Sequence, residues 1–481
     1  MYIFPNSTTN NCNGDLKQRV RITGTHCVTS LDSTQLILRI DIVQVHQLFY
    51  LSFSLFGLQP TDHKWASRWD YILETMPESK IQWVSILNSV VLVLFLSALV
   101  ATILLRTLRR DIARYSQLES SVQEESGWKL VHGDVFRPPA WGMLLCVLLG
   151  SGSQLFLMVL VTLFFACLGF LSPANRGGLM TCALAMYACS GILAGFVSAR
   201  MYKFIGGLRW KANVFLTATF CPGVVFIMFF ILNLALWILG SATAMPFGTI
   251  VALLALWLCV SLPLCFVGAL LGFRKHAIEV PVRTNQIPRQ IPFLTTYSRP
   301  VITFFLGGLL PFSCIFIQLF FIFNSLWGTQ FYFMFGLLFL VFLMLVITCS
   351  ETAILLCYFQ LCSEDYRWWW RAFHCGAGTS FYLFIYSIHY FVSRLEFRDA
   401  TSGFLYFGYI LIIVWLSFLL TGKLCHRSAT FTRLYGETSQ QLIFFSFKLS
   451  PSPSFYSVMY PDPLCSVTLV FALARSLLAN R

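Results

Sequence analysis

Nine long apolar runs cross this chain, and they constrain its fold more than any other feature of the sequence. Each run is long enough to span the hydrocarbon core of a bilayer, which is about 30 Å thick. The runs cover residues 81–105, 141–171, 179–199, 214–239, 247–272, 301–326, 331–359, 373–392 and 402–422. Backbone amides cannot stay unpaired in hydrocarbon, and runs this long without alternation exclude a barrel. The sequence therefore predicts an all-α, polytopic membrane bundle of nine transmembrane helices.

Composition and charge placement agree with a membrane protein. Hydrophobic residues make up 57% of the chain and charged residues 11%, whereas soluble domains carry about 25% charged residues. The net charge of +13 lies mainly in alternate connections. Seventeen Lys or Arg residues fall in 106–140, 200–213, 273–300 and 360–372, against three in 172–178, 240–246, 327–330 and 394–402. The positive-inside rule then predicts a lumenal N-terminus and a cytosolic C-terminus, and the charge does not indicate a nucleic-acid partner.

Residues 1–80 are polar and contain no membrane run. Period-two alternation around Arg39 and Asp41 is typical of half-buried strands. Two or three strands make a poor independent core, so we expect a lumenal remnant of a β-domain. Asn6 begins a candidate glycosylation sequon, Asn6-Ser7-Thr8, which is usable only in the lumen. Residues 1–14 lack the basic and apolar regions of a signal peptide; either the first span exports the segment or the true start lies upstream, and we favour the second.

The last segment, 423–481, differs in character from the rest. It is rich in Ser, Pro and Cys and shows no clear helical stripe. Its apolar stretch, 464–479, is short and interrupted by Arg475. We therefore expect an atypical, disordered cytosolic tail rather than a tenth span.

Polar residues inside the apolar runs are the candidates for function. Glu351 is the sharpest of them, because placing an acid in a span costs about 2.5–3.5 kcal/mol, so such residues usually face the bundle interior or a wet cavity. One hypothesis makes Glu351 an ion relay or a contact for a client helix. The other makes it structural, hydrogen-bonded to a neighbouring helix, with Gln154, Gln318 or Asn233 as partners.

His389 and the three adjacent tryptophans allow simpler interpretations. His389, near the lumenal end of run 373–392, is expected to be an interfacial side chain rather than a proton switch. Trp368, Trp369 and Trp370 lie where a cytosolic interfacial belt belongs, so membrane anchoring is the default interpretation.

Small residues and helix breakers also lie within the runs. The pairs Gly191/Gly195 and Gly268/Gly272 predict close helix packing. Two further sites, Pro222-Gly223 and Gly307-Gly308 with Pro311, predict either broken helices of the transporter kind or simple kinks.

The chemistry-bearing motifs of enzymes are not evident. Most of the sixteen cysteines sit singly in apolar runs, where they act as small apolar fillers. The sequence shows no phosphate-binding glycine loop, no paired catalytic carboxylates and no nucleophile elbow. We expect no catalytic residues, no metal and no cofactor.

Five longer strings are more specific than composition. The strings are ASRWDYIL at 66–73, GWKLVHGDVFRPP at 127–139, LSPANRG at 171–177, PVRTNQIPRQIP at 281–292 and CSEDY at 362–366. At these ordered positions, spread over 65–422, the chain resembles the nonaspanins, the transmembrane nine superfamily.

The resemblance implies a multi-pass resident of Golgi and endosomal membranes that moves other membrane proteins between compartments. It implies client recognition through Gly-rich or polar transmembrane segments, and no catalytic residues. It also implies a cleaved signal, a larger lumenal domain and a C-terminal Lys-x-Asp or Lys-x-Glu retrieval signal. The chain instead ends Ala479-Asn480-Arg481, so we expect a truncated or alternatively spliced product, without the trafficking coat machinery as a partner.

Two functions remain open. The first is a sorting or escort protein that binds client membrane proteins within the bilayer, with Glu351, Gln318, Gln154 and Asn233 as the candidate client site. The alternative is a secondary transporter or channel that uses Glu351 as its coupling acid.

Overall fold

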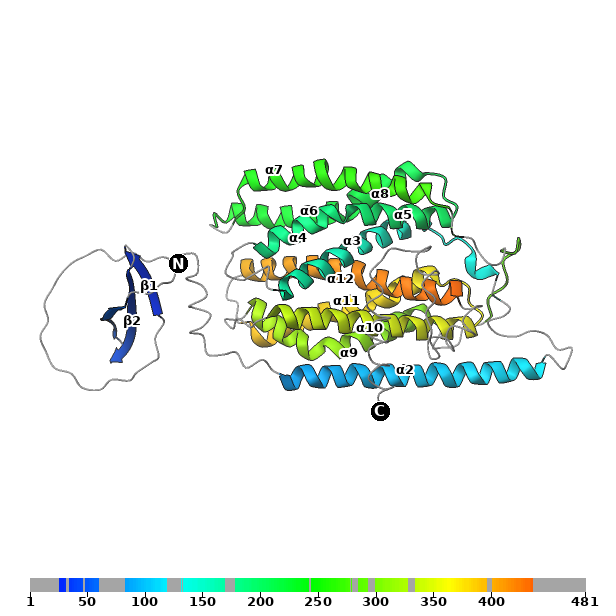
Figure 1. Cartoon of the computed structure of the whole chain (residues 1–481), viewed down its shortest axis with the longest axis horizontal. Coiled ribbons are helices and arrows are strands. Elements are labelled where there is room, and N and C mark those ends of the chain that lie inside the picture. The colour runs from blue at the N-terminus through cyan, green and yellow to red at the C-terminus, as the bar shows by residue number, and fades with distance from the viewer. Residues whose placement is uncertain are drawn as a thin grey trace, which may run out of the picture. The chain divides into compact units, whose positions relative to one another are not determined.

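The computed structural model describes the β-strands and most of the membrane domain (Figure 1). It forms two compact units, Met1–Glu78 and Ser79–Arg481. The described residues are 26–31, 34–45, 48–59, 83–118, 131, 133–168, 178–241, 244–276, 278, 284–292, 299–327, 334–395 and 400–435.

The first unit contains an antiparallel sheet of order β1-β2-β3. Its strands are β1 (His26–Leu31), β2 (Thr34–Val45) and β3 (Leu48–Gln59). The register places Ile40 opposite Phe53 and Asp41 opposite Ser52. That this sheet is the remnant of a larger lumenal domain stays a prediction, and the sequon at Asn6 lies outside the described residues.

The second unit is helical, and Figure 1 shows its helices running side by side. The helices are α2 (Trp83–Leu118), α3 (Gly142–Cys167), α4 (Gly178–Cys189), α5 (Gly191–Phe204), α6 (Trp210–Ile238), α7 (Phe247–Leu256), η4 (Trp257–Ser261), α8 (Leu262–Arg274), α9 (Pro300–Trp327), α10 (Met334–Cys362), α11 (Trp369–Arg394) and α12 (Ala400–Tyr435), with a short 3₁₀ turn η3 (Asp134–Phe136) after the first of them. The predicted helical class is confirmed for this unit.

Seven helical segments of the described chain are long and apolar enough to cross a membrane. Their mean hydropathies range from 1.8 to 2.7, and their outward faces carry exposed Leu, Ile and Phe side chains that match a lipid environment. The segments are Gly142–Cys167, Gly178–Phe204, Trp210–Ile238, Phe247–Arg274, Pro300–Asn324, Leu338–Cys362 and Thr401–Thr430. The protein is therefore a multi-pass membrane protein.

The two glycine pairs noted in the sequence form a single interface between α5 and α8. A Cβ atom on Gly268 would lie 1.9 Å from the carbonyl oxygen of Ile192, and one on Gly195 would lie 2.0 Å from that of Cys265. No side chain fits in these gaps, so the two backbones touch at glycine, as small-residue motifs in membranes allow.

The helix breaks do not occur where the sequence suggested them. Helix α6 passes through Pro222 and α9 passes through Pro311 without interruption. The irregular positions are instead Ser190, between α4 and α5, and the π-helical turn η4. These two irregularities face each other, because a Cβ on Gly191 would lie 3.0 Å from the carbonyl oxygen of Ser261.

Helix α12 continues well beyond the predicted end of the ninth run, reaching Tyr435 rather than Gly422. Polar residues suggested the earlier end, but they pack against protein. Lys423 is only 5% exposed, and its Nζ lies 4.3 Å from the ring centre of Phe156. The expected disordered tail, 423–481, is thus helical in its first part, and residues 436–481 lie outside the described chain.

Candidate functional site

Helix α2 is attached to the bundle by one narrow stripe. Ser89, Val93 and Val100 are buried and share one helical face, since residues four and seven apart align. This stripe packs on α9 and α10, where Val93 joins a buried cluster with Cys314 and Met344. The opposite face of α2 is exposed, and Phe95 there is 64% accessible. One side of α2 therefore contacts protein and the other is exposed.

Two polar contacts cross this junction. The side-chain amide of Gln318, on α9, donates a hydrogen bond to the Ser89 hydroxyl. The carboxyl of Glu351, on α10, lies close to the Ser97 hydroxyl. That hydroxyl also donates to the Val93 carbonyl oxygen at 2.9 Å, and its single hydrogen can serve only one acceptor at a time. We call Ser89, Ser97, Gln318 and Glu351 the α2 seam.

The other two predicted polar residues lie elsewhere. The Gln154 side chain donates to the Tyr187 carbonyl oxygen at 2.8 Å and joins α3 to α4. The Asn233 side-chain oxygen accepts the Met245 amide at 2.8 Å, so it closes the turn that leads into α7. Both side chains are buried and satisfy backbone groups. The structure therefore places Glu351 and Gln318 on the same junction with α2, about two helical turns apart, and Gln154 and Asn233 elsewhere.

The three tryptophans hold a distant loop. Their indole nitrogens donate to carbonyl oxygens of the segment that precedes α3: Trp368 to Val135 at 2.9 Å, Trp369 to Arg137 at 3.0 Å and Trp370 to Ala140 at 2.7 Å. Trp368 is 1% exposed and Trp369 is 3% exposed. The predicted membrane belt is therefore wrong for these two residues, because their rings lie inside the protein and their polar edges bond its backbone.

Charged residues extend this loop junction. Asp365 is buried, accepts the Arg367 amide at 2.9 Å and lies 2.6 Å from the Arg371 guanidinium. Asp134 is also buried and pairs with Arg137 at 2.9 Å. The Arg137 guanidinium also donates to the Asn285 carbonyl oxygen at 2.9 Å. Three connections that carry the family-like strings thus meet at one end of the bundle.

A basic side chain also links the end of α5 to the end of α8. The Lys203 ammonium donates to the carbonyl oxygens of Phe273 and Lys275, at 2.9 and 2.8 Å. These bonds cap carbonyls at the end of α8, where a cation is favoured. Lys203 is one of the basic residues that we interpreted as a topology signal, and it therefore also caps the end of α8.

The described residues contain no candidate metal site. No group of three or more His, Cys, Asp or Glu side chains that could hold a metal ion occurs among them. The expectations of no catalytic residue and no cofactor stay predictions.

Comparison with known proteins identifies the family. The family described as endomembrane protein 70 matches residues 22–400, which is most of the chain. The chain belongs to this family. It is 62% identical over 363 residues to transmembrane 9 superfamily member 2 of Homo sapiens, covering 75% of this chain and 55% of the relative.

More distant relatives show the same partial coverage. Transmembrane 9 superfamily member 10 of Arabidopsis thaliana is 53% identical over 380 residues, covering 78% of this chain and 59% of the relative. Member 4 of Rattus norvegicus is 49% identical over 400 residues, covering 83% and 62%. The chain spans little more than half the length of the human relative, of which it covers 55%. No solved structure matches the chain.

Proposed function

We propose that this protein acts in the intracellular trafficking and localisation of other membrane proteins by binding their transmembrane segments. The α2 seam carries the proposal. A polar seam in a bilayer is useful to a sorting protein because the alternative for a client's polar group is contact with hydrocarbon.

Ser89 and Gln318 are buried, so the accessible part of the seam is its Glu351 end, beside the peripheral helix α2. Glu351 is only half-buried, and α2 holds it from one side through Ser97. A client helix that lies beside α2 and α10 would therefore meet a carboxyl group at the edge of an apolar surface. Small or polar client residues would form hydrogen bonds there, each worth about 0.6–2 kcal/mol in membranes.

The proposal includes nine membrane spans. Helices α2 and α11 are the two spans that we add to the seven apolar segments, although both are less apolar than the others. Helix α11 contains the small and polar run from His374 to Ser380, and part of this run packs against protein. A Cβ on Gly376 would lie 2.2 Å from the Thr421 carbonyl oxygen, and one on Gly378 would lie 2.3 Å from that of Phe304. A helix enclosed in this way can span the bilayer with lower hydropathy.

We further propose that the N-terminus is lumenal, the C-terminus is cytosolic and the protein resides in Golgi and endosomal membranes. The basic connections that meet at one end of the bundle support this orientation through the positive-inside rule. The location rests on the family resemblance.

The transporter alternative loses one of its supports. It required broken helices at Pro222 and Pro311, and both α6 and α9 are continuous. The half-buried Glu351 remains compatible with it, so a flux assay in liposomes is a useful companion measurement. A pH-driven flux that Glu351→Gln abolishes would favour transport over sorting.

The direct test is co-purification of a membrane protein with a Gly-rich span from cells that express tagged wild type, Glu351→Ala or Glu351→Gln. We expect Glu351→Ala to reduce client recovery severalfold, and Glu351→Gln, which keeps hydrogen-bonding capacity, to retain more of it. Glu364→Ala is the matched control, because Glu364 follows the same helix but lies in the connection to α11. Equal recovery with Glu351→Ala and wild type would refute the client site.

A further inference from the structure

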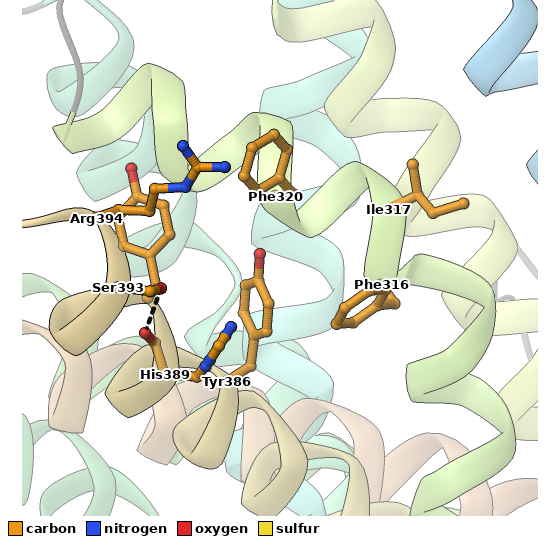
Figure 2. A pocket seen from close by; sticks show the side chains of 8 residues that line it. Phe316, Ile317, Phe320, Tyr386, His389, Ser393 and Arg394 are labelled. Atoms are coloured by element: carbon orange, nitrogen blue, oxygen red, sulfur yellow. Dashed lines mark hydrogen bonds between the residues drawn. The ribbon is translucent and has the colours of Figure 1, made fainter.

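A crevice opens between α9 and α11, far along both helices from the tryptophan junction. Its volume is about 310 Å³, and it is lined by Phe316, Ile317, Phe320, Tyr386, His389, Tyr390, Ser393 and Arg394. Figure 2 shows the aromatic rings of Phe316, Phe320 and Tyr386 along its length and the Arg394 guanidinium at one end. The side chain of His389, expected to be interfacial, is exposed along this crevice.

The crevice exists because α9 and α11 meet closely at one level and carry bulky residues at another. A Cβ on Gly308 would lie 2.2 Å from the backbone carbon of Gly378, so the helices touch there. Two turns further on, Phe316 and Tyr386 pack edge to face at 5.2 Å between ring centres. Beyond them, the Tyr390 hydroxyl bonds the Asn324 side chain at 2.9 Å and fixes the two helices on either side of the opening.

The crevice is apolar along its length and positively charged at one end. Phe316 and Ile317 are exposed on the lipid-facing side of α9, where they match hydrocarbon. Arg394 is exposed at the last residue of α11, and its guanidinium lies 5.5 Å from the ring centre of Phe320. A cation at the end of a membrane helix lies at headgroup depth, where Arg side chains extend to the interface.

We propose that this crevice binds a glycerophospholipid, with one acyl chain along Phe316, Ile317 and Phe320 and the phosphate on Arg394. The cation is placed to form a charge-assisted, bidentate pair with phosphate oxygens. The Ser393 hydroxyl, which lies beside it, already donates to the His389 carbonyl oxygen at 2.6 Å and is therefore placed to accept rather than donate.

The size of the crevice favours a lipid over a client helix. Ligand pockets range from about 300 to 1,000 Å³, so this crevice is at the lower limit and accommodates a single narrow chain. A helix with its side chains is about 10 Å across and cannot enter a space of this volume between two packed helices. None of the residues that line the crevice belongs to the α2 seam, and the proposal does not depend on the sorting function.

The test is native mass spectrometry of the purified full chain, titrated with phosphatidylglycerol or with diacylglycerol that carries the same acyl chains. We expect wild type to bind phosphatidylglycerol about tenfold more tightly than diacylglycerol, the effect of one charge-assisted pair. Arg394→Gln should remove that preference, and Ile317→Trp should weaken both lipids by filling the crevice. Arg209→Gln, at an exposed site on the other end of the bundle, and Ile238→Trp, on exposed α6 surface, are the matched controls.

Three outcomes would overturn the proposal. The first is equal binding of the two lipids by wild type, and the second is unchanged phosphatidylglycerol binding by Arg394→Gln. The third is displacement of the lipid from wild type by a Gly-rich transmembrane peptide, which would make the crevice a helix site. Gel-filtration profiles equal to wild type establish that the variants are folded.

Discussion

The indole nitrogen of Trp368 donates a 2.9 Å hydrogen bond to the carbonyl oxygen of Val135, and 233 residues of sequence separate the two. Trp368 also stacks on His426 of α12, with ring centres 5.4 Å apart. One buried ring thus connects the segment before α3, the start of α11 and the end of α12. At α2, by contrast, the bundle is held by a single buried stripe.

Replacing Trp368 tests that junction. Trp368→Phe keeps most of the ring but leaves the Val135 carbonyl oxygen without its donor in a buried position, so we expect a loss of about 1–3 kcal/mol in stability. The measurement is the midpoint of thermal unfolding in detergent. Trp141→Phe is the control, because Trp141 is 81% exposed, and a similar fall in both variants would count against the proposed importance of the buried bond.

The neighbouring acids Asp365 and Glu364 should behave differently. Asp365 is buried against Arg371, whereas the Glu364 side chain is 22% exposed and lies 3.6 Å from Arg289. Asp365→Ala leaves a largely buried guanidinium uncompensated, which costs about 3–5 kcal/mol. Glu364→Ala removes a surface pair worth about 0–1 kcal/mol. Urea unfolding of the two variants, measured by tryptophan fluorescence, would contradict this account if it gave equal losses.

The α5–α8 contact predicts a sharp difference between two glycines. Gly268→Ala places a methyl group 1.9 Å from the Ile192 carbonyl oxygen, so the helices must separate and the thermal midpoint should fall clearly. Gly248→Ala, at the start of α7, meets nothing within 4 Å and should gain up to about 1 kcal/mol in helix propensity. If Gly268→Ala is as stable as wild type, the close backbone contact is not present.

The orientation is tested by epitope insertion. A short epitope after Leu208, in a basic connection, should bind antibody in cells whose plasma membrane alone is permeabilised. The same epitope after Ser241, in a connection without Lys or Arg, should bind only after all membranes are permeabilised. The reverse pattern would invert the proposed topology.

Much of the helical architecture could be predicted because the bilayer sets the length of apolar runs. The prediction failed where polar residues pack on protein. The predicted ninth run ended at residue 422, before Lys423 and His426, yet both are buried in α12. Likewise, Trp368 next to arginines has the sequence pattern of an interfacial belt, and the pattern alone does not show whether the ring faces lipid or protein.

The sequence also did not predict which residues far apart in the chain contact each other. The sequence identified Gly195 and Gly268 as packing positions, but not that each faces the other's helix. It also grouped Glu351 with Gln154 and Asn233 because all three are polar residues within apolar runs. Only the fold shows that Gln154 and Asn233 serve nearby backbone groups while Glu351 faces α2.

The most direct test of the proposed sorting function is photo-crosslinking from adjacent positions of α2. Leu96 is half-buried at the edge of the seam and Phe95 is on the exposed side of α2, so the two form a matched pair. We predict that a photoreactive residue at Leu96 captures a client's transmembrane segment, that one at Phe95 does not, and that Glu351→Ala abolishes the capture. Equal capture from both positions, or capture that persists in Glu351→Ala, would contradict client binding at the α2 seam.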